Sequence, residues 1–446
     1  MPSTANYAIV FAVAIGTTLV VTPLCRLLAL RLGWIDQPGD RHIHTKPMPY
    51  LGGLAMLIGF LVSMAVASQL SGFDAVFEGS SIPLGVAIGA IVLCAVGTID
   101  DVRDVSPPAK TAGIVLAGSI MYLLGVSLLY FRIPFLDSLL VLGPDLAPLI
   151  TVLWVYAMAN AVNWIDGLDG LAAGIVAIAA SSFFLYGHKL ATTDVGLVSP
   201  DNPSPLIALI VAGMCIGFLP YNFNPARIFM GDGGALLLGG LMAASTVLVG
   251  GQVNDAYSGQ VYFFFAPLFI PFIVLGVPFI DALFAIVRRA RSHKGLAEAD
   301  KDHLHHRLMR LGHGQRRAVV IMWLWTALLS GFVLYPVYTG KGDAVVPVLA
   351  GAMGLILLTW FHPGVRQARE TNGQVDLLDL APTTNGSTNG RQAPAAATVT
   401  GANGADEAGE VRTAAPAAAS EETSASRPRG SAPPGRHSKK GRGART

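Results

Sequence analysis

The sequence predicts an all-α, polytopic membrane protein, a bundle of about 11 transmembrane helices. Hydrophobic residues make up 52% of the 446 residues and charged residues only 13%, and the mean hydropathy is +0.55. A soluble core cannot absorb so much apolar surface. Apolar runs near the length of a membrane span, roughly 20 residues, recur up to about residue 361. Because lipid offers no hydrogen-bond partner to an irregular backbone, these runs are expected to be helices.

The predicted spans follow one another along the chain at short intervals. They cover residues 7–30, 51–70, 82–99, 111–129, 148–162, 171–186, 206–221, 235–250, 261–287, 319–338 and 344–361. The first run has full span length and lacks the basic start of a signal peptide, so we expect it to be retained. The 50 glycines of the chain fit a membrane bundle, where small residues let helices approach closely.

Charge asymmetry predicts the orientation. Loops that follow odd-numbered spans carry 15 Lys and Arg residues, whereas the opposite loops carry three, Arg132, Lys189 and Lys341. By the positive-inside rule the odd-numbered loops are cytoplasmic. We therefore expect the N-terminus outside, the C-terminus in the cytoplasm, and a multi-pass protein of the plasma (inner) membrane whose active site faces the cytoplasm.

The composition divides the chain into two parts. Residues 1–363 form the predicted transmembrane catalytic domain, and residues 364–446 are rich in Ala, Gly, Pro and Ser and end in a basic cluster. The second part has too few large apolar residues to fold and is expected to be a disordered cytoplasmic tail. The basic residues at its end can contact anionic lipid head groups, or they can be solvated without a specific role.

Two adjacent carboxylates, Asp100 and Asp101, stand at the end of the third span. Neighbouring carboxylates repel each other, which raises one pKa or favours a bound cation. Such a pair can hold Mg²⁺ or accept a proton. The structural alternative is a solvated helix cap, for which Asp is an ordinary residue.

The third cytoplasmic loop carries polar residues at every third position, Asn160, Asn163, Asp166 and Asp169. On a helix this spacing places them along one side. Between two membrane spans such a stripe requires a polar partner, which indicates a functional site rather than a wet helix face.

The fourth loop contains Asn222 and Phe229 and leads through Gly231-Asp232-Gly233 into the eighth span. Asp232 is thus predicted at a helix N-terminus, where backbone N–H groups favour anions such as phosphate. A carboxylate there can share a divalent ion with that phosphate. Phe229 can stack on a base or simply be an interfacial aromatic residue.

The first and fifth loops are basic. The first contains Lys46, and the fifth contains His303, His305, His306 and Arg307. Clustered imidazoles can form a zinc site, but the fifth loop contains no Cys, and its neighbouring cations favour a clamp for a polyanion such as diphosphate.

These loops, in order and in residues, resemble those of the polyprenyl-phosphate N-acetylhexosamine-1-phosphate transferase family (glycosyltransferase family 4). The similarity spans about residues 33–311 and is carried by NxxNxxDGxDGLA, NxxPAxxFMGDxG, the tandem Asp and HxHH. The sequence Arg41-His-Ile-His44, with Lys46-Pro-Met-Pro, looks like the branch that uses UDP-GlcNAc. The peptidoglycan branch, phospho-MurNAc-pentapeptide transferase, has three consecutive His where this chain has His303-Leu304-His305-His306.

The resemblance implies the role of each site residue. Asp232 is expected to ligate Mg²⁺, with Mn²⁺ as the alternative, and Asp100 and Asp101 to lie at the metal or at the lipid phosphate as ligand, orienting group or base. Residues expected near the nucleotide are Lys46, Asn163, Asp166, Asp169, Asn222 and Phe229. Residues expected at the diphosphate or sugar are His303, His305, His306 and Arg307.

The expected reaction is transfer of GlcNAc-1-phosphate from UDP-GlcNAc to undecaprenyl or decaprenyl phosphate, which releases UMP and starts a cell-envelope polysaccharide. The partners are then the sugar nucleotide, the lipid and the membrane, with no nucleic acid, and a homodimer is compatible with the sequence. The alternative from another class is a membrane transporter. Its solute site would lie at span centres, whereas the acidic residues here stand at span ends.

Overall fold

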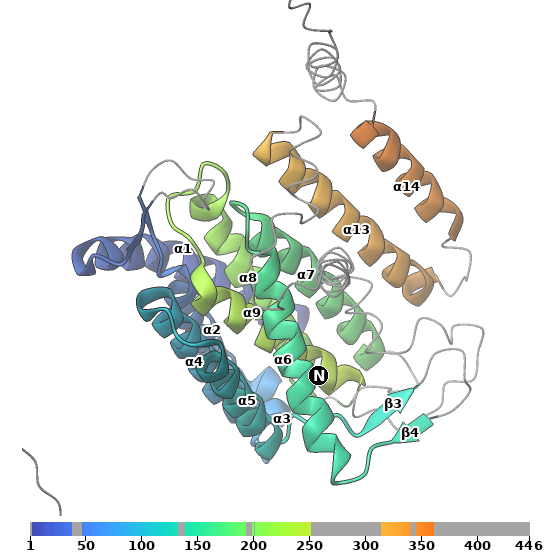
Figure 1. Ribbon diagram of the computed structural model, residues 1–446. Helices are drawn as coiled ribbons and strands as arrows, with labels where there is room; N and C mark the ends of the chain where they lie inside the picture. Colours follow the sequence, from blue (N-terminus) through green and yellow to red (C-terminus); the bar gives the residue numbers. More distant parts are fainter. Residues whose placement is uncertain are drawn as a thin grey trace, which may run out of the picture. The chain divides into compact units, whose positions relative to one another are not determined.

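The computed structural model describes residues 2–37, 47–132, 139–192, 199, 201–250, 314–339 and 345–360. Within these ranges the protein is mostly helical (Figure 1). The elements are α1 (Thr4–Leu32), β1 (Ile35–Asp36), β2 (Met48–Pro49), α2 (Gly52–Ala67), η1 (Ser71–Phe73), α3 (Asp74–Phe77), α4 (Ile82–Arg103), α5 (Pro107–Leu123), β3 (Tyr130–Arg132), β4 (Leu139–Val141), α6 (Leu146–Ile165), α7 (Leu171–Thr192), α8 (Ser204–Asn222), α9 (Gly231–Gly250), α13 (Gln315–Thr339) and α14 (Val345–Trp360).

Seven of the described helices are long and apolar enough to cross a membrane, namely α1, α4, α6, α7, α8, α9 and α13. An eighth candidate is α2 taken together with Ser71–Phe77, which continue it after a bend of 92°. Helices α5 and α14, of 17 and 16 residues, are slightly shorter than a typical span of roughly 20 residues. The predicted span 261–287 lies outside the described residues.

Most helix boundaries extend the predicted apolar runs by a few residues. The run 148–162 belongs to α6, which has 20 residues and reaches Ile165. Within this helix, Asn160 donates its side-chain amide to the carbonyl of Tyr156, one turn earlier, at 2.8 Å. The polar residue Asn163 is part of the helix although it lies beyond the apolar run.

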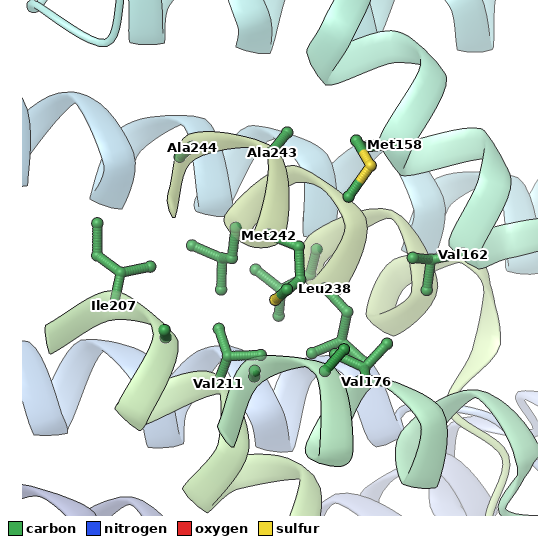
Figure 2. Packing of buried hydrophobic residues seen from close by; sticks show 14 of the residues in the cluster. Met158, Val162, Val176, Ile207, Val211, Leu238, Met242, Ala243 and Ala244 are labelled. Atoms are coloured by element: carbon green, nitrogen blue, oxygen red, sulfur yellow. The ribbon is translucent and has the colours of Figure 1, made fainter. Parts of the chain in front are cut away.

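Helix α9 lies in the middle of the bundle (Figure 1), packed against α2, α4, α6, α7 and α8. Its central residues Leu238, Met242, Ala243 and Ala244 are buried. Figure 2 shows them among apolar side chains of three neighbouring helices, which include Met158, Val162, Val176, Ile207 and Val211. The middle of α9 is thus held by helices on several sides.

Two short antiparallel pairs accompany the helices. Strand β1 pairs with β2, and β3 pairs with β4. The first pair lies next to the start of α2, where the amides of Gly52 and Gly53 donate to the carbonyls of Phe229 and Met230, at 3.1 and 3.0 Å. The segment before α9 is therefore fixed to the segment before α2.

Candidate functional site

The tandem acidic residues belong to the last turn of α4. Asp100 Oδ1 accepts a hydrogen bond from the amide of Val105 at 2.8 Å, and the helix ends at Asp104, whose φ of 47° is left-handed. Asp100 therefore helps to cap the end of α4, which is the structural role that the sequence offered as the alternative to a functional one. Asp101 points elsewhere, toward α9.

Asp101 caps the N-terminus of α9. Its Oδ1 accepts the amide of Asp232 at 2.9 Å and its Oδ2 accepts the amide of Gly233 at 3.2 Å. The first amides of a helix lack partners within the helix, and a carboxylate placed there also interacts favourably with the helix dipole. The glycine at position 231 adopts a φ of 70°, which brings the chain sharply into the helix.

Close packing of glycines permits this approach. A Cβ added to Gly97 of α4 would collide with the backbone of Asp232 and Gly233, and one added to Gly53 would collide with the backbone of Gly234. The acidic end of α9 consequently fits between α4 and the start of α2 only because these positions lack side chains.

A lysine completes the acidic cluster. Lys110, in the first turn of α5, forms ion pairs with Asp100, at 2.8 Å, and with Asp232. All three side chains are largely but not fully buried. Lys110 was not predicted as a site residue, although its position directly before an apolar run was an available signal.

Helix α6 contributes a neutral partner to the same carboxylate. Asn163 donates its amide to Asp232 Oδ1 at 2.7 Å. The predicted polar stripe is only partly helical, because α6 ends at Ile165 and both Asp166 and Asp169 lie in the following turn. Helical spacing thus accounts for Asn160 and Asn163 but not for the two acidic residues.

Asp166 lies just beyond the end of α6, close to the other acidic residues. Burial of its carboxyl group, and then the charges of Asp232, Asp101 and Asp169, raise its pKa from 3.8 to about 8. The residue as a whole is half-buried. A carboxyl group with this pKa is mainly protonated at neutral pH unless a cation approaches it.

Asp169 holds the segment between α8 and α9. Its Oδ2 accepts the side-chain amide of Asn224 at 2.9 Å and the backbone amide of Ala226 at 3.0 Å. Asn222 links the same regions, since it accepts from the amide of Gly170 and donates to the carbonyl of Ile228, both at 3.1 Å. These residues were expected near a nucleotide, and the structure places both at the contact between the turn after α6 and the segment before α9.

Phe229 lies in that segment and is fixed through its backbone. Its amide donates to the carbonyl of Pro49 at 2.9 Å, and it forms an isolated bridge with Tyr50. The cluster described so far is acidic. The predicted basic residues, Lys46, His303, His305, His306 and Arg307, all lie outside the described residues.

The described residues partly meet the requirements of a divalent ion. No three His, Cys, Asp or Glu side chains within the described ranges converge closely enough to hold a metal by themselves. Mg²⁺, however, is usually bound by one or two carboxylates together with water and substrate phosphates. Asp100 and Asp232 already share one cation, the ammonium group of Lys110. The donor set therefore fits Mg²⁺ completed by a phosphate ligand.

The fold and the site define a class of protein: a polytopic membrane protein with an acidic polar site at the ends of α4, α6 and α9. A sequence model described as "Glycosyl transferase family 4" matches residues 83–250. The chain belongs to this family.

Curated relatives cover most of the chain. It is 35% identical to the decaprenyl-phosphate N-acetylglucosaminephosphotransferase of Mycobacterium tuberculosis, over 78% of this chain and 86% of the relative. It is also 35% identical to the probable undecaprenyl-phosphate N-acetylglucosaminyl 1-phosphate transferase of Bacillus subtilis, over 71% of this chain and 81% of the relative. A phospho-N-acetylmuramoyl-pentapeptide-transferase of Mycobacterium sp. (strain JLS) is 32% identical to this chain, over 72% of this chain and 94% of the relative.

Proposed function

We propose that the protein transfers GlcNAc-1-phosphate from UDP-GlcNAc to a polyprenyl phosphate, undecaprenyl or decaprenyl. The 35% identity over 78% of the chain to a relative named for this transfer carries the proposal. The acidic cluster around Asp232 supports it, because carboxylates could hold a divalent cation that offsets the charge of a diphosphate and a phosphate brought together.

The reaction joins the lipid phosphate to the sugar phosphate. An oxygen of the polyprenyl phosphate attacks the sugar-bearing phosphorus of UDP-GlcNAc. The bond from this phosphorus to the UMP oxygen breaks, and UMP leaves with the bonding electrons. The products are polyprenyl-diphospho-GlcNAc and UMP. A phosphate nucleophile is largely ionised near neutral pH, so Asp100 and Asp101 can act by orienting groups rather than as an obligatory base.

The residues divide into two sets. Asp232, with Asp100 and Asp101 beside it, would hold Mg²⁺, and Mn²⁺ is the alternative ion. When bound, the ion neutralises charge on the transferring phosphates. Asn163 and Lys110 orient the Asp232 carboxylate. The second set is expected to contact the nucleotide, the diphosphate or the sugar, and this assignment rests on the family resemblance. It comprises Lys46, Asp166, Asp169, Asn222, Phe229, His303, His305, His306 and Arg307.

The proposed setting is the plasma membrane. About 11 spans, an outside N-terminus and a cytoplasmic C-terminus would place the ends of α4, α6 and α9 at the cytoplasmic surface. The bias of Lys and Arg toward the odd-numbered loops supports this orientation. A water-soluble sugar nucleotide and a lipid phosphate could then meet at one interface.

The test uses the purified full-length protein. It is incubated with polyprenyl phosphate, Mg²⁺ and radiolabelled UDP-GlcNAc, and in parallel with labelled UDP-MurNAc-pentapeptide. Labelled lipid and UMP from UDP-GlcNAc alone are the expected result. Transfer from the pentapeptide donor alone would replace the proposal with the peptidoglycan reaction, and no labelled lipid from either donor would refute the enzymatic proposal. EDTA should abolish transfer, and added Mg²⁺ should restore it.

A further inference from the structure

The segment 223–230, between α8 and α9, is fixed at both of its ends. Near α9, the amide of Phe229 donates to the carbonyl of Pro49, and the carbonyl of Phe229 accepts from the amide of Gly52. At the other end, Asn224 and Ala226 donate to Asp169 Oδ2. A side-chain network therefore determines where the first half of this segment lies.

That network extends to a helix far along the chain. Asn224 donates its side-chain amide to Gln315 Oε1 at 2.8 Å, and Arg316 Nε donates to the Asn224 carbonyl at 2.8 Å and to its Oδ1 at 3.3 Å. Gln315 and Arg316 form the start of α13. The rings of Phe223 and Trp323 also pack, with centroids 5.5 Å apart. Helix α13 thus attaches to the segment by polar and aromatic contacts.

The guanidinium group of Arg316 fixes the orientation of the Asn224 amide. A guanidinium can only donate hydrogen bonds, so it requires the oxygen of the amide on its side. The amide nitrogen then faces Asp169 and Gln315, both of which accept from it. Without Arg316, both the Asn224 carbonyl and its Oδ1 lose the donor that they have among the described residues, and the segment loses this backbone contact with α13.

We infer that Arg316 and Asn224 are positioning residues for the nucleotide half of the site. They orient the carboxylate of Asp169 and hold the segment that carries Phe229, without touching the reacting atoms. Asp169 Oδ2 is used by the segment, and Oδ1 has no hydrogen bond to the described residues. By this inference Oδ1 is the carboxylate oxygen that accepts from a donor group of the nucleotide. This inference rests on the proposed function, which supplies the nucleotide.

Kinetics of the full-length Arg316→Ala variant test the inference. Loss of a charge-assisted hydrogen bond should raise the KM for UDP-GlcNAc about tenfold. It should lower kcat by less than about threefold and leave the KM for polyprenyl phosphate unchanged, because only nucleotide contacts are displaced. The Kd for UMP, measured by calorimetry, should rise by the same factor. The matched control is Arg317→Ala, because Arg317 is the next residue, is exposed, and its side chain has no hydrogen bond or ion pair with the described residues.

A second variant separates orientation from loss of bulk. Asn224→Asp keeps the size of the side chain and an acceptor for Arg316, but it places a second carboxylate against Asp169. We expect a larger rise in the KM for UDP-GlcNAc than in Arg316→Ala. An Arg316→Lys variant, which retains one donor, should recover part of the affinity.

Hydrogen exchange gives a readout that does not depend on turnover. Amides of residues 223–229 should exchange faster in Arg316→Ala than in the wild type or in Arg317→Ala. Unchanged exchange, or an unchanged KM for UDP-GlcNAc in an active enzyme, would overturn the inference. Absence of transfer by the wild-type protein would instead refute the proposed function, and the exchange experiment would still decide whether Arg316 holds the segment.

Discussion

The carboxylate of Asp101 accepts the backbone amide of Asp232, with 2.9 Å between Asp101 Oδ1 and the Asp232 nitrogen. Asp101, at the C-terminus of α4, thereby caps α9, the helix that carries Asp232. The contact joins the Asp101 side chain to the Asp232 backbone, so it positions the start of α9, from which the Asp232 side chain extends. Changes at Asp101 should consequently act on both the stability of α9 and the position of the Asp232 carboxylate.

Asp101→Asn should impair both properties. An asparagine presents an NH₂ group to one of the two amides that now donate to Asp101, so at least one hydrogen bond is lost. We expect transfer to fall at least about 100-fold and the unfolding temperature to fall as well. The control is Asp104→Asn, because Asn tolerates the left-handed conformation at this position. Full activity in Asp101→Asn would contradict the assignment.

Lys110→Met should make the protein more dependent on a divalent cation. The substitution keeps the side-chain length but leaves Asp100 and Asp232 without their shared ammonium group. Two carboxylates in a partly buried site then repel each other. In EDTA the unfolding temperature of the variant should lie several degrees below that of the wild type. Added Mg²⁺ should raise the unfolding temperature of the variant by more than it raises that of the wild type. Equal effects of Mg²⁺ on both proteins would argue against a cation shared by these carboxylates.

Gly97→Ala should displace the start of α9. The added methyl group would meet the backbone of Asp232 and Gly233, which cannot move aside like a flexible side chain. Overpacking of this kind typically lowers the free energy of unfolding by about 1–3 kcal/mol. The rate of transfer should fall by more than the loss of folded protein explains, because Asp232 is shifted. Gly331→Ala in α13 is the control, since a Cβ there meets no atom within 4 Å. Similar activity losses in the two variants would contradict this explanation.

Asp166 should make stability depend on pH when no divalent cation is present. Its pKa is about 8 in the folded protein against 3.8 for an ordinary Asp, so the folded state retains a proton that the unfolded state releases. The contribution to stability is complete below pH 3.8 and is lost as the pH rises toward 8. The free energy of unfolding, measured in EDTA across this pH range, should decline with rising pH in the wild type and decline less in Asp166→Asn. Identical slopes would show that Asp166 is not the responsible group.

Much of the acidic site could be predicted from local sequence. Glycines on both sides of Asp232, directly before an apolar run, predicted a helix N-terminus, and α9 begins at Gly231. The tandem Asp at the end of a span predicted a helix end, and α4 ends at Arg103. These features depend on residues that are neighbours in sequence, so capping rules and hydropathy are sufficient.

Other features depend on contacts between distant parts of the chain. The pairing of Lys110 with Asp232 joins residues 122 positions apart, and the bond from Asn224 to Gln315 joins residues 91 positions apart. A periodic pattern carries no information about such distances. The spacing of three residues was wrong for Asp166 and Asp169 as helical positions, because α6 ends between Asn163 and Asp166 and the remaining residues form a turn.

The chain order of the helices around α9 has a consequence for biosynthesis. Among the residues that the structure describes, five helices pack on α9, namely α2, α4, α6, α7 and α8, and these precede it in the sequence. A ribosome therefore completes each of these five helices before α9 itself leaves the exit tunnel. The acidic half of the site can assemble at that moment, whereas the segment held by Arg316 must wait until α13 has been synthesised. A truncated chain that stops before α13 should accordingly retain the contact between Asp101 and Asp232 and lose the contact between Asn224 and Arg316.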